Sequence, residues 1–301
     1  MFNKKRVTKF DQKTNGLINF FDLKKPQFKI LYWSIYAFMF LMSIICLVPT
    51  IWVAVSGFKT MQEMNAVSQT FFPKHFDFSR IPKVINQVNV MKYLYNSIML
   101  IIGCWACDIT INGLAGYVLS RIKPIGSKFI DRAIFWTMLL PGISMVPLYI
   151  TFMDVPGLHI NLSGSYLPIW VMAGTNAFNI FLFKSFFNGI PMSYLEAAKI
   201  DGCTDLGIFG KIILPLSKPI IMVVTIFSIT GTWANFMWPY LILGSTDKEP
   251  IAVMLYKFSQ SGAAKNDYMI LIMLSIIPMI IMYSIFSKHI MGGLNMSGIK
   301  G

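Results

Sequence analysis

Long apolar stretches separated by short polar segments dominate the pattern of this chain. A helix needs about 20 mostly apolar residues to cross the hydrocarbon core of a bilayer, which is about 30 Å thick. Several stretches contain Pro, Gly or Asn, and such breaks are tolerated where neighbouring helices or a water-filled path satisfy the freed backbone groups. The pattern therefore predicts an all-α polytopic membrane protein with six transmembrane helices, at approximately Ile30–Ser56, Tyr93–Leu119, Phe129–Phe152, Tyr166–Phe187, Ile220–Leu243 and Met269–Ile290.

The composition excludes the soluble classes of protein. The chain is 55% hydrophobic and 13% charged, with a mean hydropathy of +0.60, whereas a soluble domain is about 45–50% apolar and about 25% charged. The same numbers exclude intrinsic disorder. Because the first apolar stretch begins near Ile30 and is too long for the core of a cleavable signal peptide, we expect it to be a transmembrane helix.

The formal net charge of +13 indicates membrane orientation rather than nucleic-acid binding. Lys and Arg collect on the cytoplasmic side of membrane proteins. With the N-terminus inside, 18 of the 26 Lys and Arg residues fall in inner segments. We therefore expect both termini in the cytoplasm. The expected order is a basic cytoplasmic arm (1–29), a first transmembrane helix with an external loop (30–92), the main transmembrane domain (93–290) and a cytoplasmic tail (291–301).

The segment 189–219, between the fourth and fifth predicted spans, has a helical pattern of its own. Good helix formers lead to Asp201-Gly202, which is a turn signal. Thr204 or Asp205 can cap a second short helix, and Pro215 can end it. The pattern predicts a cytoplasmic helix–turn–helix, which we call the elbow.

The elbow contains more apolar residues than a solvated loop needs. An apolar surface outside the bilayer requires something to cover it. The elbow either packs on its own helical bundle or the lipid interface, or it inserts into a groove of a cytoplasmic partner. Composition alone leaves these alternatives about even. The apolar positions in question are Leu195, Ile200, Leu206, Ile208 and Phe209.

A spaced motif in the elbow decides between them. Glu196-Ala197-Ala198 is followed after three residues by Gly202, after nine more by Ile212, and after one more by Leu214-Pro215. This pattern resembles the EAA motif of binding-protein-dependent ABC importer permeases. The resemblance implies that the elbow couples the chain to an ATPase subunit through Glu196, Ala197, Ala198, Asp201, Gly202, Phe209, Ile212, Leu214 and Pro215.

Two further segments indicate a branch of that family. The segment Trp233–Pro239 is similar to the fifth span of carbohydrate permeases, and the ending Gly293–Gly301 resembles the tail of the smaller maltose-transporter-type subunit. The resemblance implies a permease of the bacterial cell membrane that translocates a carbohydrate, an oligosaccharide in particular. An external solute-binding protein or lipoprotein would deliver it.

The resemblance also implies the partners of the chain. These are a second homologous permease subunit, with which it forms a heterodimer, two ATPase subunits, and membrane lipid, with no nucleic acid. The chain has no Walker A pattern, G-x-x-x-x-G-K-[ST], to hold ATP phosphates. We therefore expect no catalytic residue, metal or cofactor in this chain, with ATP and Mg bound by the partner ATPase.

Amide and aromatic side chains in the fourth and fifth predicted spans are candidates for a substrate pathway. Positions 176 and 179 share a face of a continuous helix, and so do 235 and 238. The alternative is that the Asn residues form interhelical hydrogen bonds and that Trp and Tyr anchor the chain at the interface. The candidates are Asn176, Asn179, Trp233, Asn235, Trp238 and Tyr240.

Asp108 and Asn112 lie four residues apart in the second predicted span, so they face the same way. Intramembrane carboxylates normally face a cavity or a partner. Asp108 could serve an ion-coupled secondary transporter, which is the alternative function, but we favour a carboxylate bonded to Asn112 or to a neighbouring subunit. Cys104 and Cys107 could belong to a membrane enzyme or assembly factor, and we favour two small residues on one helix face.

Overall fold

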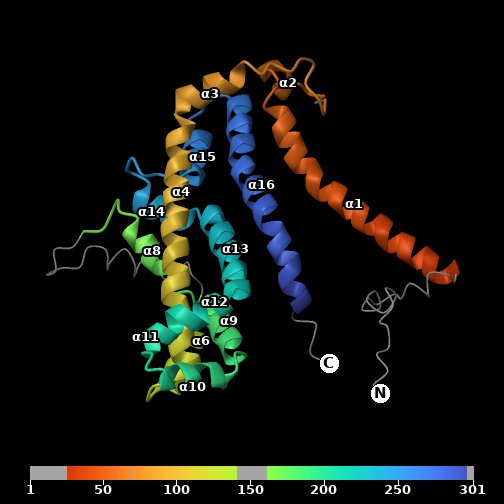
Figure 1. Ribbon diagram of the computed structural model, residues 1–301. Helices are drawn as coiled ribbons and strands as arrows, with labels where there is room; N and C mark the ends of the chain where they lie inside the picture. The colour runs from red at the N-terminus through yellow and green to blue at the C-terminus, as the bar shows by residue number, and fades with distance from the viewer. Residues whose placement is uncertain (1–25, 69, 141–160, 297–301) are drawn as a thin grey trace. The chain divides into compact units, whose positions relative to one another are not determined.

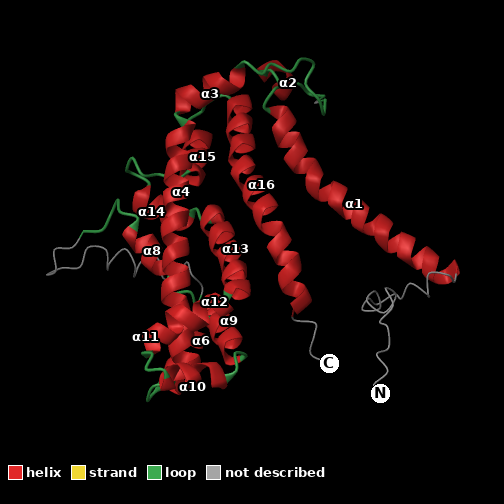
Figure 2. Cartoon of the chain, viewed as in Figure 1, coloured by secondary structure: helices red, strands yellow, loops and turns green. Residues whose placement is uncertain are grey.

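A computed structural model describes residues 26–68, 70–140 and 161–296, and the regular elements in these ranges are all helices (Figure 1, Figure 2). The predicted all-α class is confirmed. The chain divides into two compact units, Met1–Phe76 and Asp77–Gly301. Most of the predicted basic arm, the second half of the third predicted span and the last five residues of the tail lie outside the described residues.

The first unit contains α1 (Pro26–Ser56) and the short helix α2 (Met61–Asn65). The Thr60 side chain accepts a hydrogen bond from the N–H of Glu63, and the Glu63 carboxylate accepts one from the N–H of Thr60, which forms a capping box. The backbone N–H groups of Thr60 and Lys74 hold the pKa of Glu63 below its usual range. The buried Lys59 ammonium donates to the carbonyl of Thr70 at 2.5 Å.

The second unit is a bundle in which α4 packs beside α13, and α13 packs beside α16 (Figure 1). In the described residues of this unit, three π-helical turns, labelled η, interrupt the helices. The helices and turns are α3 (Arg80–Val88), α4 (Val90–Cys107), η3 (Asp108–Asn112), α5 (Gly113–Tyr117), η4 (Val118–Ile122), α6 (Ser127–Thr137), α8 (Leu167–Ala173), α9 (Ala177–Asn188), α10 (Met192–Ile200), α11 (Asp205–Ile208), η6 (Phe209–Ile213), α12 (Leu214–Leu216), α13 (Lys218–Ala234), α14 (Met237–Leu243), α15 (Ile251–Gln260) and α16 (Lys265–Met296).

Among the described residues, three helices are long and apolar enough to cross a membrane: Phe28–Ser56, Val90–Ile122 and Lys265–Phe286. A fourth span results if Asp205–Leu216 and Lys218–Ala234, which meet at 82°, are one bent segment. The fourth and fifth predicted spans are each divided into two shorter helices, α8 with α9 and α13 with α14. Polar residues lie at both divisions.

Gly116 permits two helices of the second unit to pack closely. A Cβ atom built on Gly116 of α5 would lie 2.7 Å from the Cβ atom of Phe183 on α9. Real Cβ atoms do not approach so closely, so any larger residue at position 116 would force α5 and α9 apart. This contact sets the position of α9, whose two ends lie at the cavity and at the elbow.

Hydrogen bonds from α4 fix the segment before α15. The side-chain amide of Asn96 donates to the carbonyl oxygens of Asp247 at 2.9 Å and Glu249 at 3.0 Å. The Ser97 hydroxyl accepts from the N–H of Ile251 at 2.9 Å. Both side chains are buried, so these bonds satisfy backbone groups that would otherwise lack partners.

Candidate functional site

The elbow is a helix–turn–helix in which α10 and α11 are joined by a tight turn. Gly202 has φ of +80°, the left-handed region that favours glycine. The N–H of Cys203 donates to the carbonyl of Ala198 at 2.9 Å, which closes the end of α10. Of the two predicted caps, Thr204 begins α11, because its hydroxyl accepts from the N–H of Gly207 at 3.2 Å.

One face of the elbow is buried against the bundle. Leu195, Ile208 and Phe209 are buried in a cluster with aromatic side chains of α5 and α9. The ring centroid of Phe209 lies 5.3 Å from that of Tyr117 and 6.5 Å from that of Phe187. This face is therefore covered by the chain itself, as the first alternative expected.

The other face of the elbow is exposed and partly apolar. The side chains of Ile200 and Leu206 are 86% and 71% exposed. The motif residues divide between the two faces. Ala198 and Phe209 are buried and Ile212 and Leu214 are half-buried, whereas the exposed members are Glu196, Ala197, Asp201, Gly202 and Pro215.

Arg121 fixes the approach to the elbow, and the sequence did not single it out as a site residue. Its guanidinium donates to the carbonyl oxygens of Phe187 and Ile190, near the end of α9 and just before α10. Carbonyl groups at a helix C-terminus lack helical partners, and an arginine can satisfy them. The sequence feature that could have indicated this role is the position of an Arg at the end of an apolar span.

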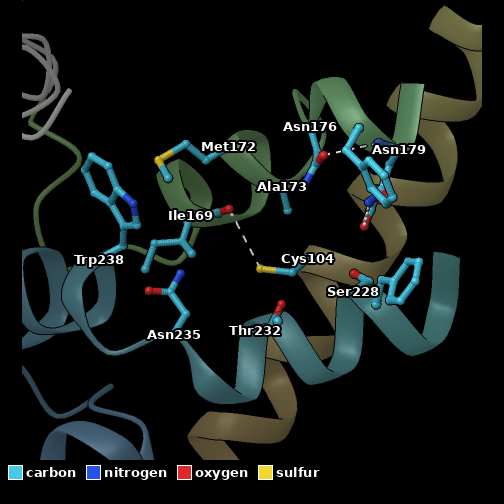
Figure 3. A pocket seen from close by; sticks show the side chains of 14 residues that line it. Cys104, Ile169, Met172, Ala173, Asn176, Asn179, Ser228, Thr232, Asn235 and Trp238 are labelled. Atoms are coloured by element: carbon cyan, nitrogen blue, oxygen red, sulfur yellow. Dashed lines mark hydrogen bonds between the residues drawn. The ribbon is translucent and has the colours of Figure 1, made fainter. Parts of the chain in front are cut away.

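A cavity of about 340 Å³ lies among α4, η3, α8, α9, α13 and the start of α14 (Figure 3). This volume falls near the lower end of the about 300–1,000 Å³ typical of small-molecule sites. In Figure 3, Trp238 and Asn235 lie on one side of the view, and Asn179 and Ser228 lie on the other. The lining residues are Cys104, Asp108, Ile169, Met172, Ala173, Asn176, Phe178, Asn179, Phe227, Ser228, Gly231, Thr232, Asn235 and Trp238.

A network of amide side chains surrounds the buried Asp108 carboxylate. The Asn112 amide donates to Asp108 Oδ1 at 2.6 Å, and the Asn179 amide donates to both carboxylate oxygens at 2.9 Å. Asn112 also donates to the carbonyl of Ala173 at 3.0 Å and accepts from the N–H of Asn176 at 3.1 Å. The network thereby joins the π-helical turn η3 to the break between α8 and α9.

The pairs Asn176 with Asn179 and Asn235 with Trp238 were each predicted to lie on one face of a continuous helix, but the structure places a helix end within each pair. Asn176 caps α9, and its side chain accepts from the N–H of Asn179 at 3.2 Å. Asn235 ends α13 in an extended conformation, and Trp238 belongs to α14. The continuous helices assumed for these pairs are therefore wrong, because Asn competes with the helix backbone and favours caps. All four residues nevertheless line the cavity.

The other two pathway candidates lie elsewhere. Trp233 packs against a separate apolar cluster of α3, α4, α15 and α16. The Tyr240 ring stacks on that of Phe236, with centroids 5.2 Å apart. Ser228 and Thr232, which line the cavity from α13, were not predicted from the sequence. Hydroxyl side chains are common in apolar helices, where they bond to the backbone of their own helix. The sequence therefore does not distinguish a hydroxyl that lines a cavity from one that does not.

The Cys pair makes no disulfide, because all four cysteines of the chain are free. Cys104 is buried and its thiol donates to the carbonyl of Ile169 at 3.8 Å. Cys107 is half-buried on the same helix. The described residues contain no group of three or more His, Cys, Asp or Glu side chains that could hold a metal ion.

The chain is similar to proteins of known families. Residues 112–293 match the family described as binding-protein-dependent transport system inner membrane component. The polygalacturonan/rhamnogalacturonan transport system permease protein YtcP of Bacillus subtilis is 31% identical over 283 residues, which cover 89% of this chain and 97% of that protein.

More distant relatives cover the same region. The diacetylchitobiose uptake system permease protein NgcG of Streptomyces coelicolor is 27% identical over 86% of each chain. The trehalose/maltose transport system permease protein MalG of Thermococcus litoralis is 27% identical over 87% of this chain and 94% of that protein. A chain of a bacterial ABC transporter that imports the acidic polysaccharide alginate has the same fold, with a TM-score of 0.75 at 24% identity, covering 88% of this chain and 98% of that chain.

Proposed function

Because this chain belongs to the family of binding-protein-dependent transport system inner membrane components, we propose that it is a membrane-spanning permease subunit of an ATP-driven ABC importer for a carbohydrate. It crosses the cell membrane several times. The relatives are named for polygalacturonan, diacetylchitobiose and trehalose or maltose. These saccharides share no single sugar unit, so the class that they support is an oligosaccharide and not one particular sugar.

The proposed topology has six spans with both termini in the cytoplasm. The helices α1, α4 to η4 and α16 make three spans. The third begins with α6, and the broken pairs α8–α9 and α13–α14 make the fourth and fifth. Broken helices are stable in a bilayer where they line a cavity or are buried in protein, and the two breaks do border the cavity. The distribution of Lys and Arg then puts the elbow in the cytoplasm.

The observation that carries the proposal is the two-faced construction of the elbow. A loop needed only as a connector would not bury Leu195, Ile208 and Phe209 while it exposes Ile200 and Leu206. Exposed apolar side chains on a rigid support are typical of a binding surface. We infer that an ATPase subunit covers Ile200 and Leu206 together with the exposed motif residues.

The helix α9 provides the mechanical connection from the elbow to the cavity. Its end carries Phe187, which packs against Phe209 of the elbow, and its first turn carries Asn179, which binds Asp108. These two positions are eight residues apart, so a rigid helix separates them by about 12 Å. A displacement of the elbow would therefore move a wall of the cavity.

Nucleotide chemistry lies outside this chain in the proposed complex. Two ATPase subunits bind ATP and Mg, a second permease subunit completes the pore, and an external solute-binding protein or lipoprotein delivers the saccharide. ATP can shift the pore between inward-facing and outward-facing states only by as much as it binds the two states differently. The elbow must therefore be held firmly, which the aromatic cluster beneath it allows.

The test replaces an exposed apolar residue of the elbow by a charged one. In the complete complex, Leu206→Asp should reduce co-purification of the ATPase and lower ATP-dependent uptake at least tenfold, since a carboxylate would be buried at an apolar contact. Ile200→Asp should behave in the same way. Uptake and ATPase recovery are measured in proteoliposomes and by affinity purification.

The matched control is Ile125→Asp. Ile125 is fully exposed and lies in another inner segment, between η4 and α6. The same change there should leave uptake and ATPase recovery near those of the unmodified complex. Equal loss in the elbow variants and the control, or no loss in any of them, would contradict the proposed docking surface.

A further inference from the structure

The described lining of the cavity contains an acidic side chain and no basic one. Among the described residues that line it, Asp108 carries the only acidic group, and none is Lys, Arg or His. Only 3% of this residue is exposed. In a buried site a charge acts more strongly than in water, since the effective dielectric constant is lower. The negative charge of the Asp108 carboxylate therefore affects the binding of any ligand that enters the cavity.

The partners of Asp108 are neutral. Its carboxylate accepts from the side-chain amides of Asn112 and Asn179. The ion pairs of the described residues are Arg80–Asp267, Lys184–Asp131, Lys199–Asp205 and Lys257–Glu249, so none involves Asp108. The Ser228 hydroxyl is a further side-chain hydrogen-bond partner of this carboxylate. An amide N–H can bond only to an accepting oxygen, and an ionised carboxylate accepts at both of its oxygens. Amide donors stabilise the negative charge without cancelling it.

The rest of the lining is suited to an uncharged, hydroxyl-rich ligand. Asn179 is 3% exposed, and its side-chain oxygen is a buried acceptor with no hydrogen-bond partner. Ser228, Thr232 and Asn235 add hydroxyl and amide groups from α13 and its end. The aromatic rings of Phe178, Phe227 and Trp238 offer apolar surface to the faces of sugar rings. Such a mixture of apolar rings and a few polar groups is typical of small-molecule sites.

We propose that Asp108 makes this cavity select by charge, so that the saccharide carried is uncharged and uronic-acid saccharides are rejected. The proposal rests on the proposed function for the identity of the ligand as a saccharide. An anionic sugar in the cavity would meet Asp108 with no cationic side chain of the described lining to offset the repulsion. The substrate class thereby differs from that of YtcP, whose named substrate polygalacturonan consists of uronic acids.

The first experiment measures the potential of the cavity without any sugar. Cys46, Cys104, Cys107 and Cys203 are replaced by Ala or Ser, and Thr232→Cys introduces one thiol into the lining of the cavity. The complete complex is treated with two methanethiosulfonate reagents, one carrying trimethylammonium and one carrying sulfonate. The ratio of the two labelling rates is the readout. Thiolate content affects both rates equally, so it cancels from this ratio.

The reference thiol is Ile125→Cys in the same cysteine-free chain, because Ile125 is fully exposed. The cation-to-anion rate ratio should be about tenfold or more higher at position 232 than at position 125, as a nearby unit charge in a partly buried site requires. Asp108→Asn should bring the ratio at position 232 down toward the reference. The comparison of positions 232 and 125 stands by itself if Asp108→Asn does not fold. Equal ratios at the two positions would overturn the proposal.

The second experiment measures uptake of two matched probes, maltotriose and trigalacturonic acid, by the complete complex with its solute-binding protein. One outcome would overturn the charge selection and leave the proposed function intact. In it, the cation-to-anion labelling ratio is higher at position 232 than at position 125, yet ATP-dependent uptake of trigalacturonic acid is at least as fast as that of maltotriose. ATP-dependent uptake of maltotriose with exclusion of trigalacturonic acid supports it. If no saccharide is taken up with ATP, the proposed function fails, while the labelling ratio still reports the charge of the cavity.

Discussion

The elbow and the cavity are built in opposite ways, although both contact α9. The elbow packs on a cluster of buried aromatic side chains, and its exposed face is partly apolar. The cavity is open, and its important contacts are hydrogen bonds among Asp108, Asn112 and Asn179. Apolar packing resists deformation because interiors are close-packed. A hydrogen-bonded rim can exchange partners with a ligand. The difference fits the proposed roles, in which the elbow transmits displacement and the cavity recognises the substrate.

The largest effect should come from emptying the cluster beneath the elbow. Phe187 is completely buried, so Phe187→Ala should destabilise the protein by about 3–5 kcal/mol, through lost contacts and the space left behind. Phe178 is 48% exposed at the cavity and is the matched control. Phe178→Ala should cost much less. Thermal unfolding in detergent measures both, and similar costs at the two positions would remove the distinction between a packed elbow and an open cavity.

The next effect is on the amide network of the cavity. Asn179→Ala removes the donor to both oxygens of Asp108 and should cost about 1.5–3 kcal/mol, the range for hydrogen bonds to charged groups. If this cost comes from the lost hydrogen bonds to the Asp108 carboxylate, Asn179→Ala should destabilise an Asp108→Asn protein by less than half as much as it destabilises the unmodified protein. Thermal unfolding of the four proteins completes the double-mutant cycle. Additive costs would show that Asn179 acts through packing and not through Asp108.

The two sites also differ in how far the sequence could predict them. The elbow is one contiguous segment, so its turn at Gly202, its cap at Thr204 and its spaced motif could all be recognised in a single reading. The cavity is assembled from three distant segments, around positions 108, 176 and 232. Helical periodicity placed Asn235 and Trp238 on one face of a continuous helix. Both residues do line the cavity, but the helix ends at Asn235. Trp233 and Tyr240 were candidates because aromatic faces suit sugar rings, and neither lines the cavity. Contacts between segments are decided by packing, which a local pattern does not contain.

A smaller effect on folding, but a clear one on transport, is expected at Gly202. No side chain or backbone atom lies near a Cβ built there, so only the backbone conformation resists substitution. Gly202→Val should cost about 1–3 kcal/mol of backbone strain at positive φ and lower uptake by uncoupling the elbow, with membrane insertion intact. Asn tolerates this conformation, so Gly202→Asn is the control and should retain most uptake. Unchanged uptake and substrate-stimulated ATP hydrolysis in Gly202→Val would refute the coupling.

The smallest effect should come from the exposed ion pair of the elbow. Lys199 Nζ lies 3.2 Å from Asp205 Oδ1, and the two side chains are 58% and 48% exposed. Exposed pairs contribute about 0–1 kcal/mol and are screened by salt. Lys199→Gln should therefore change the unfolding temperature little, and raising the salt concentration should reduce the remaining difference, because salt screens a pair that only the unmodified protein has. If Lys199→Gln were as damaging as Phe187→Ala, charge rather than apolar packing would hold the elbow, and its contrast with the cavity would disappear.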